Sequence, residues 1–164
     1  DAPCFEQPSI PDFESDAEDL ILKLKKMSPK ALCTLMSISD DLAQMNWSRF
    51  QNWKCLAENN NAIQPVFAFT GEVYRGLDAS SLKSDEINYA QDIIRVLSGL
   101  YGILKPLDGI SPYRLEMGTK FSSMKGQRNL YEFWGERITK NLNTDLNTDD
   151  VIINLASKEY SNVI

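Results

Sequence analysis

Residues 97–118, LSGLYGILKPLDGISPYRLEMG, decide how this chain folds, because they contain four glycines and two prolines within one stretch. Apolar residues recur at helical offsets just before it and predict a helix over 84–97. Gly99 and Gly102 follow, and glycine readily takes the left-handed conformation that ends a helix. The stretch is therefore predicted to be the C-terminal cap of that helix, followed by a loop.

Two turns are predicted in this loop, over 105–109 and 111–114, and consecutive turns usually lie at the surface. Arg114 and Glu116 are two residues apart, so in an extended segment they share a face, where they pair or hold a ligand. Spacing alone favours structural turns over a ligand site. The side chains expected close together at this surface are Tyr101, Lys105, Asp108, Tyr113, Arg114 and Glu116.

The rest of the chain predicts a mixed α/β (α+β) fold. Apolar residues at helical spacing indicate helices, and short continuous apolar runs bounded by glycine or proline indicate buried strands. No repeat or linker divides residues 1–164, which we expect to form a single compact domain of short buried strands with surrounding helices. Further helices are expected over 15–27, 29–36 and 130–142, and two helices with a break near Asn46 are expected over 39–53. Buried strands are expected over 66–69 and 151–156.

Composition excludes several classes of function. The 164 residues are 43% hydrophobic and 24% charged, a mix typical of a globular domain. No apolar run approaches the roughly 20 residues that span a bilayer, and the first residues lack the pattern of a signal peptide, so we expect a cytoplasmic protein with no membrane partner. The chain has no histidine and three widely spaced cysteines, which excludes His-based nucleophile pairs and His-ligated metals. We therefore expect no metal and no cofactor.

The net charge of −6 argues against a surface that is basic all over, and it leaves room for a local basic face. Acidic residues gather in the first forty residues and around 145–150. Nucleic acid and nucleotide ligands both remain open on this evidence. Basic residues cluster with turns and aromatic residues at Arg75, Arg95, Lys105, Arg114, Lys120, Lys125 and Arg128.

The stretch LAQMNWSRF, residues 42–50, predicts a corner between two helices, with a break near Asn46. A helix-hairpin-helix motif binds a phosphate with backbone N–H groups at such a corner. Ala43 and Gln44 would then lie in the hairpin, Asn46 would adopt a positive φ, and Arg49 would supply charge. On the residues alone, an ordinary corner with buried Met and Phe side chains is favoured over this motif.

Two further segments leave predicted strands at their carboxyl ends, where open α/β sheets bind ligands. FTGEVYRGL, residues 69–77, presents Tyr74 and Arg75. NLASKEY, residues 154–160, presents Ser157, Lys158 and Glu159 at the end of the last predicted strand. A ligand pocket and an ordinary strand-to-helix connection explain these segments equally well.

The order and spacing of FTGEVYRGL, LSGLYGILKPLDGISPYRLEMG, NLYEFWGERITKNLN and VIINLASKEY resemble the YaaA family of bacterial peroxide stress proteins. The similarity extends from about Leu32 onward, and PYRLEMG and NLASKEY are unusual enough to make it specific. Members of this family are longer at both ends. The resemblance therefore implies that residues 1–164 are a YaaA-like domain truncated at both ends.

The resemblance also implies a cytoplasmic protein that limits intracellular unincorporated iron and damage from hydrogen peroxide. It implies a basic cleft and a helix-hairpin-helix-like element, which together bind double-stranded or branched DNA. The residues placed at this element are Ala43, Gln44, Asn46 and Arg49. The residues placed at the cleft are Tyr74, Arg75, Gly99, Gly102, Lys105, Tyr113, Arg114, Glu116, Ser157 and Lys158.

The resemblance supplies no reaction, and DNA binding without catalysis is the leading hypothesis. The alternative is an enzyme acting on a nucleobase or nucleoside, with Glu116 or Glu159 as general acid or base and a nucleotide-like ligand in the cleft. In that hypothesis Tyr113 stacks on the base and Arg114 holds phosphate. A third hypothesis is a protein-interaction module whose turns only pack.

Overall fold

The computed structural model describes residues 7–122 and 124–164. Within them the fold is mixed α/β, as predicted, with helices around a two-stranded antiparallel sheet. The elements are α1 (Glu14–Leu24), α2 (Pro29–Met36), α3 (Asp40–Gln51), η1 (Leu56–Glu58), α4 (Pro65–Ala68), α5 (Glu72–Leu77), η2 (Ala79–Ser81), α6 (Ser84–Ile93), β1 (Val96–Ser98), β2 (Gly102–Leu104), α7 (Leu130–Trp134), α8 (Arg137–Thr144) and α9 (Lys158–Ser161).

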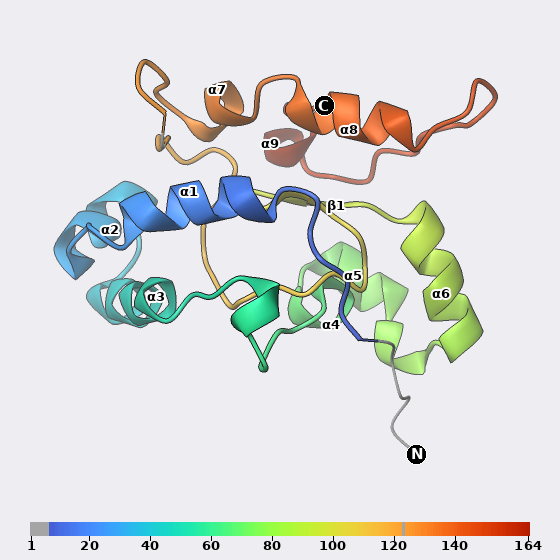
Figure 1. Ribbon diagram of the computed structural model, residues 1–164, viewed down its shortest axis with the longest axis horizontal. Coiled ribbons are helices and arrows are strands. Elements are labelled where there is room, and N and C mark those ends of the chain that lie inside the picture. Colours follow the sequence, from blue (N-terminus) through green and yellow to red (C-terminus); the bar gives the residue numbers. More distant parts are fainter. Residues whose placement is uncertain (1–6, 123) are drawn as a thin grey trace.

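Helix α1 and the β1–β2 hairpin lie across the middle of the molecule in Figure 1, with α7, α8 and α9 on one side and α3, α4 and α5 on the other. The buried face of α1 is a stripe of Ala17, Leu20, Ile21 and Leu24 at helical spacing. Both strands are buried against this stripe and against α7. The core therefore lies around the hairpin.

Helix α6 ends at Ile93, four residues before the predicted end, and the chain continues as a strand. The Arg95 guanidinium donates hydrogen bonds to the carbonyl oxygens of Gln91 and Asp92, each at 3.1 Å, and so satisfies the last turn of α6. The predicted helix over 84–97 is therefore too long. Ser98 pairs with Gly102 across the hairpin, so Gly99 follows the end of β1 and Gly102 begins β2, and neither glycine ends a helix.

Residues 111–116 form neither helix nor strand and lead into a turn at 117–118, and along residues 111–120 the side chains alternate between the core and the surface. Leu115 and Met117 are buried, whereas Arg114 and Glu116 are exposed. The predicted sharing of one face by Arg114 and Glu116 is confirmed. The predicted exposure of Tyr101 and Asp108 is wrong, because both side chains are buried.

Both predicted strands are absent from the described residues. Residues 65–68 form the single helical turn α4, for which Pro65 supplies the first position. Residues 151–156 are extended but unpaired, and in Figure 1 they return beneath α8. The side chains of Val151, Ile153 and Leu155 are 84%, 78% and 69% exposed. No backbone hydrogen bond joins this run to another described segment.

Two predicted helix boundaries also differ. The helix expected over 130–142 is divided into α7 and α8 at Gly135, which has a φ of 50°. Conversely, the break predicted near Asn46 is wrong, because α3 is continuous over Asp40–Gln51. The corner lies instead between α2 and α3, where Ser37 takes the left-handed conformation and Ser39 caps α3.

Candidate functional site

Four tyrosines from separate segments form what we call the tyrosine cluster: Tyr74, Tyr101, Tyr113 and Tyr160. Tyr101 and Tyr113 have ring centroids 5.5 Å apart in an edge-to-face arrangement. Phe69 joins α5 to this group, with its ring centroid 5.4 Å from that of Tyr74 and 6.5 Å from that of Tyr113. The segments 69–77, 111–120 and 157–161 therefore come together at this cluster.

Hydrogen bonds hold the two innermost phenols in place. The Trp53 indole N–H donates to the Tyr101 hydroxyl oxygen at 2.9 Å, and the Ser111 backbone N–H donates to the same oxygen at 3.1 Å. The hydroxyls of Tyr113 and Ser98 are hydrogen-bonded at 2.5 Å. These contacts fix the rings rather than leaving them free to rotate.

The phenols of the cluster are held neutral. Burial raises the pKa of Tyr74 and of Tyr101 to about 12, with the neighbouring Tyr160 adding to the effect at Tyr74. Burial also raises the pKa of Tyr113 and of Tyr160, and the Glu159 and Glu116 carboxylates add to the effect at Tyr160. At neutral pH the cluster offers hydrogen-bond donors and aromatic faces, not bases.

The exposed edge of the 111–120 segment carries charge beside Tyr160. Arg114 and Glu116 form an ion pair at 2.5 Å. The Gly118 backbone N–H donates to the Glu159 carboxylate at 2.7 Å, and the Tyr131 hydroxyl donates to the backbone oxygen of Glu159 at 2.8 Å. The first bond connects α9 to the turn at 116–118, and the second connects α9 to α7. Arg114, Glu116 and Glu159, all predicted from the sequence, are thus brought to one place.

Other predicted cleft residues lie elsewhere or serve packing. A Cβ on Gly99 would collide with the Leu115 carbonyl, and one on Gly102 would lie 2.9 Å from the Trp134 ring, so neither glycine has room for a ligand. Lys105 belongs to the turn around Asp108, its backbone N–H donating to that carboxylate at 2.7 Å. The remaining three, Arg75, Ser157 and Lys158, are exposed, and Arg75 pairs with Glu72.

The residues predicted to bind DNA through a hairpin all lie on one continuous helix, α3. Ala43 and Asn46 are each 1% exposed and face the core. The Asn46 amide nitrogen donates to the Leu42 carbonyl at 2.8 Å, while among the described residues nothing hydrogen-bonds its Oδ1. Gln44 is exposed and Arg49 is half-buried, whereas the side chains of Ala43 and Asn46 point inward. Phosphate binding at these four residues stays a prediction.

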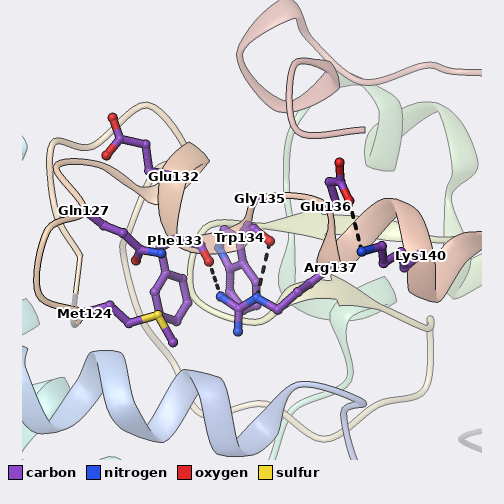
Figure 2. A pocket seen from close by; sticks show the side chains of 9 residues that line it. All are labelled: Met124, Gln127, Glu132, Phe133, Trp134, Gly135, Glu136, Arg137 and Lys140. Atoms are coloured by element: carbon purple, nitrogen blue, oxygen red, sulfur yellow. Dashed lines mark hydrogen bonds and ion pairs between the residues drawn. The ribbon is translucent and has the colours of Figure 1, made fainter.

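A shallow hollow of about 330 Å³ lies between α7 and α8, away from the tyrosine cluster (Figure 2). Two cations line it. Arg137 lies 4.5 Å from the Phe133 ring centroid and bonds to Asp16 and to the Phe133 and Trp134 carbonyls, whereas Lys140 pairs with Glu136 at 2.9 Å. The Arg137 guanidinium therefore connects α8, which carries it, to α7 and to α1. No predicted cleft residue lines this hollow, and none lines a second hollow beside Gln91 and Leu107.

Sequence reasoning missed Phe69, Ser98 and Tyr160 as parts of the cluster. The sequence pattern predicts a strand at Phe69. It predicts that Ser98 directly follows a helix, but that helix, α6, already ends at Ile93. Tyr160 lies within NLASKEY, next to the predicted Glu159, so the motif itself was the available signal. Its position depends on the docking of α9, which no local pattern encodes.

In the described residues no group of three or more Cys, Asp or Glu side chains is placed to share a metal ion. None of the described helices is both long and apolar enough to cross a bilayer.

Comparison with known proteins gives one consistent result. The family model described as "Peroxide stress protein YaaA" matches residues 1–164. UPF0246 proteins of Burkholderia mallei and Burkholderia pseudomallei are 53% identical over 154 residues, covering 92% of this chain and 59% of theirs. A UPF0246 protein of Burkholderia thailandensis is 52% identical over 156 residues, covering 93% and 60%. The chain spans about three fifths of the length of these relatives.

Proposed function

The chain belongs to the peroxide stress protein YaaA family, and from this premise we propose that it limits oxidative damage by binding DNA. The observation that supports this proposal is the exposed Arg114 guanidinium near the half-buried Tyr160 ring, which in turn lies near the half-buried Tyr74. Aromatic faces beside a cation suit a nucleic acid, because bases stack on the rings while phosphate pairs with the guanidinium. The protein then acts in the cytoplasm, where bacterial DNA lies.

Arg114 is the residue on which this proposal can be tested. Its side chain is 42% exposed, and in the described part of the chain it pairs with Glu116, whose side chain is 51% exposed, so a phosphate can compete for it. We expect Arg114→Ala to weaken binding of a fluorescent 20-base-pair duplex three- to tenfold in an anisotropy titration. Lys83→Ala, at an exposed cation before α6, is the matched control and should bind like the parent chain.

Protection from iron follows from the same proposal. Occupied DNA offers fewer phosphate sites to unincorporated iron, so the protein lowers iron-dependent damage without chelating the metal. If the parent chain does not bind duplex DNA at low salt, the proposed function is wrong. If it binds but Arg114→Ala is without effect, DNA binding stands and its placement at this edge is wrong.

A second function is favoured by one observation, the pair of carboxylates near a single phenol. Glu116 and Glu159 both raise the pKa of Tyr160, so both carboxylates lie near its hydroxyl. Two carboxylates beside a ring are chemically adequate for general acid-base cleavage of a glycosidic bond in a nucleoside. Release of free base from nucleosides or damaged DNA, lost in Glu116→Gln or Glu159→Gln, would support this enzyme over simple binding.

A further inference from the structure

Trp53 and the tyrosine cluster form a chain of neighbouring rings that one-electron oxidants attack readily. Indole and phenol lose an electron far more easily than the phenyl ring of phenylalanine. The Trp53 indole N–H donates to the Tyr101 hydroxyl oxygen at 2.9 Å, and the ring centroids of Tyr101 and Tyr113 are 5.5 Å apart. The Phe69 ring lies between Tyr113 and Tyr74, with its centroid 6.5 Å and 5.4 Å from theirs. The chain therefore leads from a buried indole toward the surface helices.

The inner end of this chain is shielded from reductants in solution. Trp53 is 5% exposed and Tyr101 is 1% exposed. The Tyr101 hydroxyl oxygen also accepts a hydrogen bond from the Ser111 backbone N–H at 3.1 Å, and the Tyr113 hydroxyl is bonded to that of Ser98 at 2.5 Å. These bonds fix the rings against one another, so an electron can pass between them without movement of the chain. An oxidised Trp53 indole must therefore recover its electron from neighbouring rings.

The outer end of the chain has groups that can accept a phenolic proton. A phenol that loses an electron also releases its proton, so it needs a base nearby. Tyr160 is half-buried, and the Glu159 and Glu116 carboxylates lie near enough to raise its pKa. Tyr160 in turn raises the pKa of Tyr113 and of Tyr74, so it lies near both rings. At Tyr160, an electron and a proton can therefore both leave the phenol.

The second buried tryptophan, Trp134, has different surroundings. In the described part of the chain its aromatic neighbours are Phe13 and Phe133, with ring centroids 5.5 Å and 4.9 Å from its own. The Arg137 guanidinium carbon lies 5.1 Å from the centroid of the Trp134 ring, and this positive charge disfavours removal of an electron from the indole. The path to the surface thus belongs to Trp53 and is not a general property of the buried indoles.

We propose that four of these rings form a relay that carries oxidising equivalents from the core to the surface: Trp53, Tyr101, Tyr113 and Tyr160. This protective function goes beyond DNA binding and does not depend on it. An oxidising radical takes one electron from the Trp53 indole and becomes an anion. One electron then passes from Tyr160 through the two intermediate rings to Trp53. The indole, which keeps its N–H proton, is restored, and Tyr160 becomes a neutral phenoxyl radical.

The proton and the radical are then both accounted for at the surface. The Tyr160 phenol gives its proton to the Glu159 or Glu116 carboxylate, which returns it to solvent. A small thiol donates a hydrogen atom to the phenoxyl oxygen, which restores the phenol and leaves a thiyl radical. Two thiyl radicals join as a disulfide. Each cycle therefore moves one electron from a thiol to the oxidising radical and leaves the protein unchanged.

Pulse radiolysis with the azide radical, which oxidises tryptophan in preference to tyrosine, tests the relay. In the parent chain the indolyl absorbance should decay as the phenoxyl absorbance grows, at a rate independent of protein concentration. Tyr101→Phe keeps the ring but removes the oxidisable phenol, and it should slow this growth about tenfold. Tyr89→Phe, at a tyrosine that is 65% exposed, is the matched control and should behave like the parent.

A second pair of variants tests where the relay begins. Trp53→Phe should remove the fast phase of phenoxyl growth, whereas Trp47→Phe, at a half-buried tryptophan, should keep it. For the other end, Tyr160→Phe should lower the electron paramagnetic resonance signal of the phenoxyl radical at least threefold. Adding glutathione to the parent should shorten the lifetime of that signal in proportion to the thiol concentration.

The inference is wrong if Tyr101→Phe and Trp53→Phe both transfer the electron at the parent rate, and DNA binding would be unaffected by that result. An undiminished phenoxyl signal in Tyr160→Phe would likewise overturn the exit assigned to this ring. Circular dichroism melts show whether each variant is folded. If Tyr101→Phe does not fold, Tyr113→Phe interrupts the same path with its ring retained, and parent-like transfer in that variant would exclude the relay.

Discussion

The indole ring of Trp134 packs directly on Gly102, with ring carbon Cζ3 2.9 Å from the position that a β-carbon would occupy. The same glycine has a φ of 71°, which a side chain rarely adopts. Trp134 also donates its indole N–H to the Gly99 carbonyl at 3.1 Å. One residue of α7 thus holds both glycines of the hairpin.

We expect Gly102→Ala to lower the free energy of unfolding by about 2–4 kcal/mol, because it adds backbone strain and a clash with a fully buried ring. Urea denaturation measures the change. Gly76→Ala is the control: nothing lies within 4 Å of its added methyl group, and the helical position favours alanine, so stability should rise slightly. Equal effects at the two glycines would contradict this account of the hairpin.

Tyr113→Phe should destabilise the fold by about 1–2 kcal/mol, since it removes one partner of the 2.5 Å hydrogen bond to Ser98 within the tyrosine cluster. Tyr89→Phe, at a tyrosine that is 65% exposed, should be neutral. Thermal melts of the two variants measured side by side give the comparison. A neutral Tyr113→Phe would mean that the Ser98 hydroxyl finds another partner without cost.

Stability should decline as the pH rises above about 10. The pKa values of Tyr74 and Tyr101 are raised to about 12 in the folded chain, so between about pH 10 and pH 12 the unfolded chain releases phenolic protons that the folded chain keeps. The folded state then binds more protons than the unfolded state, and raising the pH favours unfolding. Urea midpoints from pH 8 to pH 11.5 should be level and then fall, less steeply in Tyr74→Phe.

Asn46→Leu should leave duplex binding unchanged, because Asn46 is buried within continuous α3 rather than exposed in a hairpin. Its stability should lie within ~1 kcal/mol of the parent chain, since the substitution removes an unpaired buried oxygen together with a local hydrogen bond. Arg49→Ala, at the predicted DNA-binding cation of the same helix, should weaken binding. A loss of DNA affinity in a well-folded Asn46→Leu variant would restore the hairpin hypothesis.

Iron(II) should bind only weakly, with a dissociation constant above about 1 µM. The chain has no histidine, and carboxylate oxygens alone make a weak site for this metal. Burial, together with the neighbouring Asp40, raises the pKa of the Cys33 thiol, so it stays protonated at neutral pH and is a poor ligand. Anaerobic titration with a competing chromophoric chelator measures this affinity, and a stoichiometric submicromolar complex would contradict the DNA-based account of iron protection.

Helices were predicted from the sequence wherever one face is apolar for several turns. The stripe from Ala17 to Leu24 required α1 to be helical whatever packed against it. Short apolar runs do not distinguish a strand from a helix, because four residues such as 66–69 fit a strand or a helical turn equally well. The end of α6 depends on the hydrogen bond from the Arg95 guanidinium to the Gln91 carbonyl, and the spacing of apolar residues does not predict such a bond.

For the site, the two-residue spacing of Arg114 and Glu116 correctly predicted a shared exposed face, since alternation is a local property of extended chain. The joining of Tyr74, Tyr113 and Tyr160 depended on contacts between segments as far apart as α5 and α9. The break predicted at Asn46 is wrong because residues 40–51 are compatible with a single helix, which packs against α1 and α2 without a bend.

The unpaired run over 151–155 has a consequence for handling the protein. An exposed apolar run whose backbone N–H and C=O groups bond to no other backbone group in the described residues is a template on which another chain can add a strand, so crowding or heating should promote aggregation through this run. Asp149 and Asp150 stand directly before it and act as gatekeepers, since like charges on two approaching copies repel. Acidic buffers and high salt weaken that repulsion, and they should shorten the time for which the purified chain stays monodisperse.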